Sequence, residues 1–361
     1  DKSKLFIDAI YGIGLSRNIN NKECAILNTI DKHPAPVIAI DIPSGIDCNT
    51  GKILGFAAYC DLTITFSTLK IGHILIPGSE KINKIKILDI GISKDVINKI
   101  KPDIKINSKN QWLNKIIWPK IDDHKYSRGY SLIIGGPRNM TGASRLAALS
   151  AQRAGSGIVA LVSDKKAEEI YFNSLTSQLV KTYKNIKEYN SIINEYRVDS
   201  IVIGPGLDIS NSSILKIKSV LKTNKRIVLD AGAISCFKNK LKLFTKILSG
   251  KDVIITPHEG ELKSILPNLS GSLISKALKS AKILNTIVVL KGPTTVIASP
   301  NNKAFVNTAG AKWLATAGSG DVLAGIIGGL LSNKMETFYA AAYGVWMHSE
   351  AGKYLGPGLI A

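Results

Sequence analysis

Short, unbroken runs of aliphatic residues recur along the chain, and a small or polar residue follows each run at once. Seven runs share this arrangement, at residues 5–7, 37–40, 132–134, 201–203, 227–229, 253–255 and 287–290. Continuous rather than alternating hydrophobicity, rich in isoleucine and valine, is typical of strands that are buried on both faces. The pattern therefore predicts a parallel sheet covered by helices.

The segments between these runs have the hydrophobic spacing of helices. The clearest of them lie at residues 142–154, 211–221, 271–284, 322–331 and 336–354. Strands that alternate with helices predict an α/β fold. In such folds ligands bind beyond the carboxyl ends of the strands, so the polar residues that follow the runs are the first candidates for chemistry.

The alternation lapses in one lysine-rich stretch, at residues 94–123, where neither period is clear. We place a linker there, between a first domain at residues 1–93 and a second domain at residues 124–361. A length of 361 residues agrees with two domains, or with one domain and a fragment. Because the first aliphatic run begins at Leu5, we expect the sequence to begin inside a domain.

Composition excludes several classes of protein. With 45% hydrophobic and 20% charged residues, the chain has the composition of a core-forming globular protein rather than of a disordered or fibrous one. Its longest uncharged apolar stretch, residues 322–331, is half as long as the roughly 20 residues of a membrane-spanning helix, so we expect no membrane partner. Four cysteines without a C-x-x-C pair favour a reducing compartment and predict a cytoplasmic location.

The chain carries 47 lysine and arginine residues against 27 aspartate and glutamate residues, a formal net charge of +20. The lysines are scattered through nearly every segment, and the sequence has no arginine-rich cluster or aromatic-interleaved basic stripe of the kind that follows nucleic acid. A solvated lysine-rich surface explains this charge better than nucleic-acid binding does, so we expect no nucleic-acid partner. A bound polyphosphate ligand is compatible with either interpretation.

The strongest local signal is the hexapeptide T-A-G-S-G-D that ends at Asp321 and leads into the helical pattern at residues 322–331. A glycine-rich turn at a helix start presents unpaired backbone N–H groups and the positive end of the helix dipole to an anion. A carboxylate there can accept the proton of an alcohol that attacks a phosphoryl group, mainly by orienting the alcohol. The alternative is that Asp321 only complements the dipole, which is worth about 0.3 to 1 kcal/mol.

A second group of polar residues follows the run at residues 287–290. Its members are Lys291, Gly292, Pro293, Thr294 and Thr295, which offer a cation, a tight turn and two hydroxyl groups. This segment suits the phosphates or the adenosine of a nucleotide, although a hairpin turn with an exposed lysine explains it equally well. The sequence contains neither a G-x-x-x-x-G-K-S/T loop nor a G-x-G-x-x-G turn after a strand, so a nucleotide would need another scaffold.

His258 follows the run at residues 253–255 and lies beside Glu259 and Glu261. A metal site would require a second histidine or cysteine at ligand spacing, and the sequence has none nearby. We expect His258 to hydrogen-bond a ligand, with capping of the following helix as the alternative. The other histidines form no paired set, and we assign them no catalytic role. Ser44, in P-S-G rather than G-x-S-x-G, does not support a hydrolase.

Two carboxylates in the first domain, Asp8 and Asp41, also follow aliphatic runs, and glycine-containing loops come just after them. Carboxylates with small-residue loops at neighbouring strand ends suit a cation or the hydroxyl groups of a ribose. Ordinary turn chemistry is the alternative, because aspartate and glycine are common turn residues.

Together these residues resemble the bifunctional NAD(P)H-hydrate repair enzymes, in which an epimerase domain precedes an ADP- or ATP-dependent dehydratase domain. The first domain resembles the carboxyl-terminal part of the epimerase at residues 5–9, 41–45 and 89–91. In the second domain the resemblance rests on an ordered series of motifs: His124-Lys125, Arg128-Gly129, Gly135-Gly136, Met140-Thr141-Gly142-Ala143, Ala154-Gly155-Ser156-Gly157, Gly204-Pro205-Gly206, Thr256-Pro257-His258, Lys291-Gly292 and Gly318-Ser319-Gly320-Asp321.

The resemblance implies a ribokinase-like second domain that dehydrates the S-hydrate of NADH or NADPH (NADHX or NADPHX). In this family ADP or ATP, with Mg²⁺, phosphorylates the ring hydroxyl, and loss of phosphate regenerates the reduced nicotinamide. The resemblance makes Asp321 the base and places Gly320 in the anion hole. It also assigns nucleotide contacts to Lys291, Gly292, Pro293, Thr294, Thr295 and Gly320, and hydrate contacts to Ala143, Gly206, His258 and Asp321.

For the first domain the resemblance implies a partial Rossmann-like epimerase domain that interconverts the R- and S-hydrates and binds K⁺. Its potassium ligands would be Asp8 and Ser44. Its substrate contacts would be Gly12, Ile13, Gly14, Leu15, Ser16, Arg17, Asn18 and Asp41. We expect the protein to be a homo-oligomer.

The sequence departs from the family pattern in two places. The family's N-N-G-G-D-G segment, which supplies a further potassium ligand, does not occur in it, so we expect the epimerase site to be incomplete. The family's D-A-D-A motif reads Asp230-Ala231-Gly232-Ala233, so the second carboxylate is missing.

Two other functions stay open from the sequence. A ribokinase-like kinase of a small hydroxymethyl vitamin precursor uses a similar glycine-rich turn and aspartate, but it releases a stable phosphorylated product. A non-catalytic protein that binds nucleotides or nucleic acid is favoured only by the net charge of +20.

Overall fold

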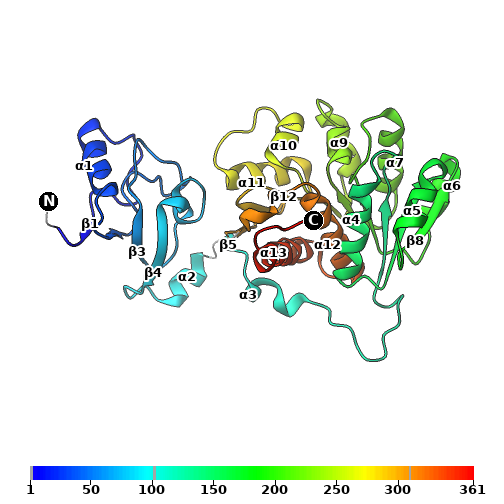
Figure 1. Ribbon diagram of the computed structural model, residues 1–361, viewed down its shortest axis with the longest axis horizontal. Coiled ribbons are helices and arrows are strands. Elements are labelled where there is room, and N and C mark those ends of the chain that lie inside the picture. Colours follow the sequence, from blue (N-terminus) through cyan, green and yellow to red (C-terminus); the bar gives the residue numbers. More distant parts are fainter. Residues whose placement is uncertain (1–2, 101–102, 309) are drawn as a thin grey trace. The chain divides into compact units, whose positions relative to one another are not determined.

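The computed structural model describes residues 3–100, 103–308 and 310–361. The chain divides into two compact units, Asp1–Asp103 with Gly271–Leu273, and Ile104–Ser270 with Ile274–Ala361. Each unit is a sheet accompanied by helices, as Figure 1 shows. The α/β fold predicted from the sequence is confirmed.

The first unit is built on a four-stranded parallel sheet in the order β1-β2-β3-β4. Its strands are β1 Phe6–Asp8, β2 Val37–Ile40, β3 Cys60–Phe66 and β4 Ile82–Leu88. Its helical segments are α1 Asn21–Asp31, η1 Ile71–His73, η2 Gly78–Lys81 and α2 Lys94–Ile100. Among its described residues, the buried apolar side chains form three small clusters rather than one continuous core.

The second unit is built on a ten-stranded sheet in the order β5-β14-β13-β12-β11-β10-β9-β6-β7-β8. The strands from β12 to β8 in this order are all parallel, whereas β13 pairs antiparallel with both of its neighbours. The strands are β5 Ile104–Ile106, β6 Tyr130–Ile134, β7 Ile158–Asp164, β8 Leu179–Tyr183, β9 Ser200–Ile203, β10 Arg226–Leu229, β11 Val253–Ile255, β12 Ile287–Leu290, β13 Thr295–Ala298 and β14 Ala304–Asn307.

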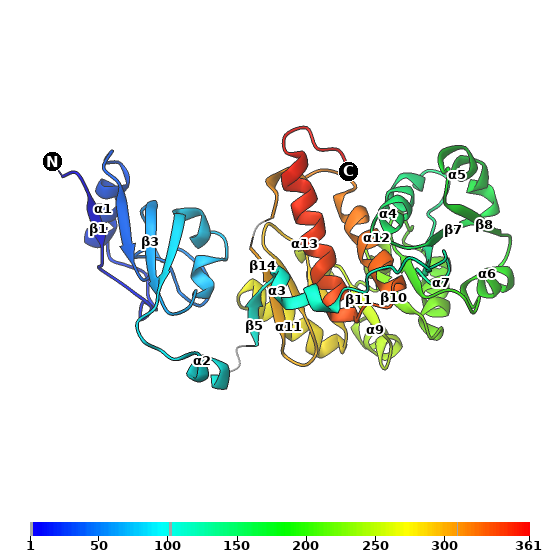
Figure 2. The same ribbon diagram turned by 90° about the horizontal axis from the view of Figure 1, so that it is seen from below.

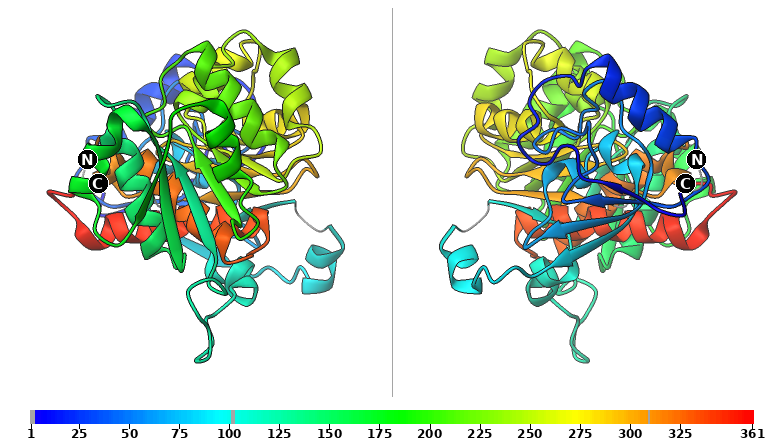
Figure 3. Two further views of the ribbon diagram at one scale, coloured as in Figure 1. Left: turned by 90° about the vertical axis from the view of Figure 1, so that its right-hand side faces the viewer. Right: turned by 90° about the vertical axis from the view of Figure 1, so that its left-hand side faces the viewer.

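Helices cover both faces of this sheet, as Figures 2 and 3 show. One face carries α4 Thr141–Arg153, α12 Ser319–Ser332 and α13 Thr337–Leu355. The opposite face carries α7 Asn211–Lys222, α9 Leu241–Leu248, α10 Glu259–Ile265 and α11 Leu273–Leu284. The shorter segments are α3 Lys109–Trp112, η3 Leu113–Lys115, η4 Lys165–Ala167, α5 Glu168–Ser174, α6 Ile186–Ile193, α8 Gly232–Ser235 and η5 Lys312–Leu314. In the part of the chain that the structure describes, no helix is both long and apolar enough to cross a membrane.

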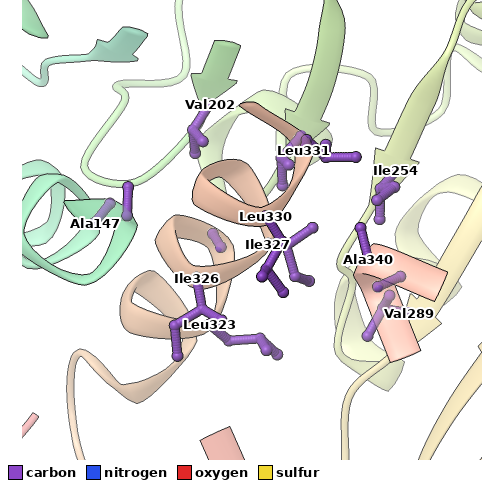
Figure 4. Packing of buried hydrophobic residues seen from close by; sticks show 14 of the residues in the cluster. Ala147, Val202, Ile254, Val289, Leu323, Ile326, Ile327, Leu330, Leu331 and Ala340 are labelled. Atoms are coloured by element: carbon purple, nitrogen blue, oxygen red, sulfur yellow. The ribbon is translucent and has the colours of Figure 1, made fainter. Parts of the chain in front are cut away.

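Helix α12 lies at the centre of one continuous core. Figure 4 shows its aliphatic side chains against Val202 of β9, Ala147 of α4 and Ala340 of α13. Its glycines allow close backbone contact, because a Cβ built at Gly325 would lie 2.2 Å from the carbonyl oxygen of Ala147. A Cβ built at Gly329 would similarly lie 2.3 Å from the carbonyl oxygen of Ala151. The position of the start of α12 is therefore fixed by direct packing against α4.

The segment at residues 94–123, which we expected to be a linker, contributes to the second unit from Ile104 onward. Strand β5 pairs parallel with β14, at the edge of the ten-stranded sheet. Trp112 is buried, and its ring centroid lies 4.4 Å from that of Tyr343 and 5.1 Å from that of Trp346. An edge strand with alternating Ile and Lys lacks the continuous hydrophobicity of a central strand, which is why the sequence pattern did not predict it.

Candidate active site

The carboxyl ends of β10, β11 and β12 bring an aspartate, a threonine and a lysine together. Lys291 follows β12, and its Nζ donates a hydrogen bond of 2.6 Å to Oδ1 of Asp230, which follows β10. Thr256, which follows β11, donates its hydroxyl to the same oxygen at 2.7 Å. Burial alone would lower the pKa of Lys291, but the charge and hydrogen bond of Asp230 raise it above its ordinary value. Lys291 is therefore a fixed positive charge at this edge of the sheet.

Asp321 lies in the first turn of α12, close enough to this pair for both charges to act on it. Within the described residues its carboxylate has no hydrogen-bond donor, unlike that of Asp230. Burial raises the pKa of Asp321 to about 6, and the charge of Asp230 adds to this effect while Lys291 opposes it. An unpartnered carboxylate with a pKa near neutrality is suited to accept a proton at physiological pH.

The backbone before Asp321 adds an anion-binding element. Gly318 is the N-cap of α12, and its φ of 89° is a left-handed conformation that glycine adopts without strain. A Cβ built at Gly320 would lie 3.4 Å from Nζ of Lys291. The lysine ammonium and the unpaired N–H groups of the first helical turn therefore act on one small volume. Such a volume stabilises a phosphoryl group as negative charge accumulates on it.

The segment after β12 combines the two roles that the sequence left open. Strands β12 and β13 pair antiparallel, so the residues from Lys291 to Thr294 do form a hairpin turn. Lys291 is nevertheless directed at Asp230 rather than at solvent, with 19% of its side chain exposed. Thr294 is buried, and the hydroxyl of Thr295 donates to the carbonyl oxygen of Gly292 at 3.2 Å.

His258 caps α10, as the alternative interpretation predicted. Its Nδ1 accepts from the backbone N–H groups of Gly260 at 3.0 Å and Glu261 at 3.2 Å. In the neutral ring the proton therefore resides on Nε2, and 60% of the side chain is exposed. The backbone of His258 also forms a bridge with that of Lys291, so the two residues are neighbours at this edge of the sheet. Capping uses one ring nitrogen and leaves the other available to a ligand.

The turn Gly204-Pro205-Gly206 joins this group to the start of α4. A Cβ built at Gly204 would lie 1.8 Å from the carbonyl oxygen of Asp230, so only glycine fits there. On the other side of the turn, a Cβ built at Gly206 would lie 3.4 Å from Cβ of Ala143. Ala143 and Gly206, which the sequence assigned to one ligand, are therefore neighbours.

In the first unit, Asp8 and Ser44 come together as the sequence predicted. The carboxylate of Asp8 accepts from the backbone N–H of Ser44 at 2.7 Å and from its hydroxyl at 2.5 Å. The carbonyl oxygen of Tyr11 lies 3.3 Å from the same hydroxyl oxygen. A carboxylate, a hydroxyl and a carbonyl oxygen thus cluster beyond β1.

Asp41 lies beyond β2 with a left-handed φ of 68°. Lys70 and Thr65 both donate to its Oδ1, and Nε2 of His73 donates to its backbone oxygen at 2.8 Å. Although burial alone would raise the pKa of Asp41, its hydrogen bonds with Lys70 and Thr65 hold it below its ordinary value. Lys70 and His73 were not predicted from the sequence, because they come from the segment after β3 and carry no motif.

The predicted substrate loop of the first unit borders a hollow of about 250 Å³. Gly12, Gly14, Leu15, Ser16 and Arg17 line it, and a Cβ built at either glycine would meet no atom within 4 Å. The lining does not include Ile13 and Asn18, the other two predicted residues of this loop.

Asp230 is the residue of the second unit that the sequence analysis left without a role. The available signal was its position, because it directly follows the run at residues 227–229 just as Lys291 follows the run at residues 287–290. No set of three or more histidine, cysteine, aspartate or glutamate side chains suited to a metal ion occurs among the described residues.

Two family models match the chain. The model described as NAD(P)H-hydrate dehydratase matches residues 131–356, and the model described as YjeF-related protein N-terminus matches residues 1–72. A bifunctional NAD(P)H-hydrate repair enzyme of Dictyoglomus turgidum is 31% identical over 360 residues, which cover 96% of this chain and 69% of that protein. These matches confirm the resemblance inferred from the sequence.

Two solved structures confirm the ribokinase-like fold. A ribokinase-like superfamily protein of Enterococcus faecalis superimposes with a TM-score of 0.61 at 26% identity, over 70% of this chain and 88% of that chain. An ADP/ATP-dependent NAD(P)H-hydrate dehydratase of Bacillus subtilis, co-crystallised with ATP and Mg²⁺, has a TM-score of 0.61 at 25% identity over 71% of this chain and 93% of that chain.

Proposed function

The chain belongs to the NAD(P)H-hydrate dehydratase family, and we propose that its second unit uses ADP or ATP to return the S-hydrate of NADH or NADPH to the reduced dinucleotide. One observation carries this proposal. The unpartnered carboxylate of Asp321 lies beside the fixed charge of Lys291, at the N-terminus of α12. Transfer of a phosphoryl group to an alcohol needs a base for the alcohol and positive charge for the phosphoryl oxygens, and both are present here.

In the first step Asp321 accepts the proton of the ring hydroxyl as its oxygen attacks the terminal phosphorus of the nucleotide. The bond from that phosphorus to the nucleotide's bridging oxygen breaks, and the shortened nucleotide leaves with the electron pair. Lys291 and the backbone N–H of Gly320 stabilise the charge that spreads over the transferred group. In the second step the phosphate leaves with its carbon–oxygen bond electrons, and loss of a ring proton restores the double bond.

Mg²⁺ fits this site as a companion of the nucleotide. This ion keeps several waters and is usually held by one or two carboxylates plus substrate phosphates rather than by an all-protein cage. The charges of Asp230, Glu261 and Asp321 all act on Lys291, and of these Asp230 and Asp321 would face such an ion. When bound, Mg²⁺ neutralises charge on the nucleotide phosphates.

The remaining assignments follow the same arrangement. Lys291, Gly292, Pro293, Thr294 and Thr295 would hold the nucleotide, since they form one hairpin next to Gly320. Ala143, Gly206 and His258 would contact the hydrate. The adjacency of Ala143 and Gly206 supports this part of the proposal, as does the exposed Nε2 of His258, which lies 3.7 Å from a carboxylate oxygen of Glu261.

The first unit would epimerise the hydrate, with Asp41 and the loop from Gly12 to Asn18 as substrate contacts. Its cluster of oxygen atoms suits a hard cation, and Asp8 and Ser44 would be the ligands of K⁺. The hollow that Gly12 and Arg17 border supports this assignment. A cytoplasmic location and a homo-oligomeric state remain proposals, the former supported by four free cysteines.

The decisive experiment incubates the purified S-hydrate with the protein and either ADP or ATP, and follows the return of dihydronicotinamide absorbance. Recovery with one nucleotide and none in its absence is the expected result. No recovery with either nucleotide refutes the proposed dehydration. A kinase of a small hydroxymethyl vitamin precursor would instead accumulate a stable phosphorylated product, which phosphorus NMR detects.

A further inference from the structure

A second cavity, of about 880 Å³, lies at the same edge of the ten-stranded sheet, beyond the carboxyl ends of β6, β7, β8 and β9. Cavities of this volume bind small molecules. The lining includes two carboxylates, Asp164 and Asp208, and three cations, Arg138, Lys166 and Lys216. None of these five residues belongs to the groups assigned above to the base, the nucleotide or the hydrate.

The topology of the sheet favours a ligand at this place. From β6 the chain continues to β7 and β8 on one side, whereas β9 lies on the other side of β6. The winding direction therefore reverses between β6 and β9, and parallel sheets bind ligands in the crevice at such a reversal. The cavity lies at this reversal, because it is lined by Gly135 and Gly136 after β6 and by Leu207 and Asp208 after β9.

The β6-α4-β7 motif is arranged like the strand-helix-strand motif of a dinucleotide site, but it lacks the G-x-G-x-x-G turn. Gly136 occupies the turn between β6 and α4, and a Cβ built there would lie 2.4 Å from the carbonyl oxygen of Gly206. Asp164 ends β7, and its Oδ1 accepts from the backbone N–H of Lys166 at 2.9 Å, which holds the carboxylate at the cavity. In units of this layout, an acid near the end of the second strand accepts hydrogen bonds from ribose hydroxyls.

The charged groups suit a diphosphate next to that ribose. Lys216, on α7, lies with its Nζ 5.2 Å from the ring centroid of Tyr183. The carboxylate of Asp208 already accepts a hydrogen bond of 2.9 Å from the hydroxyl of Ser213. Arg138 follows the glycine turn after β6. Arg138 and Lys216 therefore offer positive charge from two sides of the cavity.

The distance between the candidate active site and this cavity suits one substrate molecule that reaches both. Strands β10 and β7 are three strand positions apart in the sheet, a distance of about 14 Å. A hydrated nicotinamide dinucleotide has its reacting ring at one end and adenosine at the other, joined through a diphosphate. The Gly204-Pro205-Gly206 turn lies between the two places, where a bare backbone lets a ligand approach closely.

Building on the dehydratase function proposed above, we propose that this cavity binds the adenosine diphosphate half of the hydrate. Asp164 accepts hydrogen bonds from the ribose hydroxyls, while Arg138 and Lys216 contact the diphosphate. A phosphate on the ribose 2′ oxygen would lie against the carboxylate of Asp164. The cavity therefore selects the hydrate of NADH over the hydrate of NADPH.

The test measures binding without turnover. ADP-ribose, which is this half of the substrate without the nicotinamide, is titrated calorimetrically into the full chain after the nucleotide site has been saturated with a non-hydrolysable ATP analogue. We expect Lys216→Gln to weaken binding about tenfold, since it removes one charge-assisted contact. Lys222→Gln, an exposed lysine of the same helix that does not line the cavity, is the matched control and should leave binding unchanged.

Selectivity is tested with the 2′-phosphate of ADP-ribose. We expect it to bind the unmodified chain about tenfold more weakly than ADP-ribose, and we expect Asp164→Asn to remove this difference. Asparagine still accepts from the N–H of Lys166, so the turn is retained, and equal melting temperatures check this. In steady-state assays Lys216→Gln should raise KM for the hydrate and leave kcat and KM for ADP unchanged.

The outcomes separate this inference from the function on which it rests. Absence of ADP-ribose binding, or equal affinity in the Lys216 and Lys222 variants, overturns the cavity assignment even when dehydration occurs. Unchanged discrimination in Asp164→Asn overturns the selectivity. Binding that depends on Lys216 in a protein that does not dehydrate the hydrate keeps the dinucleotide site and refutes the proposed reaction.

Discussion

Both units place carboxylates beyond the ends of parallel strands, and the second unit adds Asp321 in the first turn of α12, whose surroundings differ from those of all the others. In the first unit Asp8 and Asp41 accept hydrogen bonds from nearby donors, chiefly Ser44 and Lys70. In the second unit Asp230 takes the available lysine, and Asp321 has no donor among the described residues. The hydrogen-bond donors around a carboxylate therefore decide its role. A carboxylate with donors is held as a binding group, whereas one without donors can accept a proton.

The units also differ in how firmly they hold these groups. The first unit has small separate clusters of buried side chains, whereas a continuous core surrounds α12 in the second. A base acts only when it is held in reach of the alcohol, and a misplacement of about 1 Å can cost about 100-fold in rate. The rigid element thus carries the residue with the stricter geometric requirement.

The largest expected effect comes from removing the unpartnered carboxylate. Asp321→Asn should lower the turnover of the S-hydrate by about 1,000-fold, because the amide cannot accept the proton of the ring hydroxyl. Nucleotide affinity should change little, since the base acts in the transition state. Asp8→Asn, the same substitution at a strand end of the first unit, is the control and should leave dehydration unchanged. Full activity of Asp321→Asn would remove this residue from the mechanism.

The next largest effect concerns the pair that faces Asp321. Lys291→Gln should lower turnover by about 100-fold and reduce the free energy of unfolding by about 2 to 4 kcal/mol, because Asp230 is left buried without its counter-ion. Urea unfolding and steady-state kinetics measure the two quantities.

The double variant Lys291→Gln with Asp230→Asn separates charge from structure. It should recover most of the lost stability but not the lost turnover, since the amide is neutral and the cation is still missing. Recovery of turnover would show that Lys291 serves only to hold Asp230.

The pH dependence should be smaller but diagnostic. Asp321 accepts a proton only when it is ionised, so the rate should be constant above its pKa and fall as the pH drops through about 6, to about a tenth at one pH unit below. Because Lys291 lowers the pKa of Asp321, the midpoint should move to higher pH in Lys291→Gln. A profile of kcat/KM with an unchanged midpoint in that variant would contradict the assignment.

The smallest expected effects are changes in the free energy of unfolding, which should have opposite signs in the two units. The raised pKa of Asp321 means that its contribution to stability is lost as the pH rises through about 6, so Asp321→Asn should increase the free energy of unfolding at pH 8 by about 1 kcal/mol. The pKa of Asp41 is lowered, so its contribution is present above the ordinary aspartate pKa, and Asp41→Asn should destabilise the fold at pH 8. Thermal unfolding at pH 8 of both variants compares the two signs.

The strands buried on both faces were predictable because their hydrophobicity is unbroken. The run at residues 227–229 ends at the same residue as β10, and the run at residues 287–290 has the same bounds as β12. By contrast, β4 is almost entirely exposed, and its alternation of Ile with Asn and Lys resembles a loop or surface segment. One or both faces of an edge strand are exposed to solvent, so polar residues interrupt its hydrophobic residues. A search for continuous hydrophobic runs therefore misses edge strands.

The candidate site could be predicted residue by residue but not as an assembly. Asp321, Lys291 and His258 were identified from strand ends and a glycine-rich turn. The Asp230–Lys291 pair joins residues 61 positions apart, and no local pattern encodes that contact. The raised pKa of Asp321 depends on burial by the surrounding fold and on charges from two other strand ends, which the sequence does not display.

The glycines of α12 have a further consequence. Where a helix touches its neighbour through carbonyl oxygens, even one added methyl group pushes the two apart, whereas a leucine at a purely aliphatic contact can be exchanged for an isoleucine. Two positions of α12, Gly325 and Gly329, face carbonyl oxygens of α4 in this way, so a larger residue at either of them would force the two helices apart. Because Asp321 lies in the first turn of this helix, a methyl group added at either glycine would displace a reacting group that it never touches.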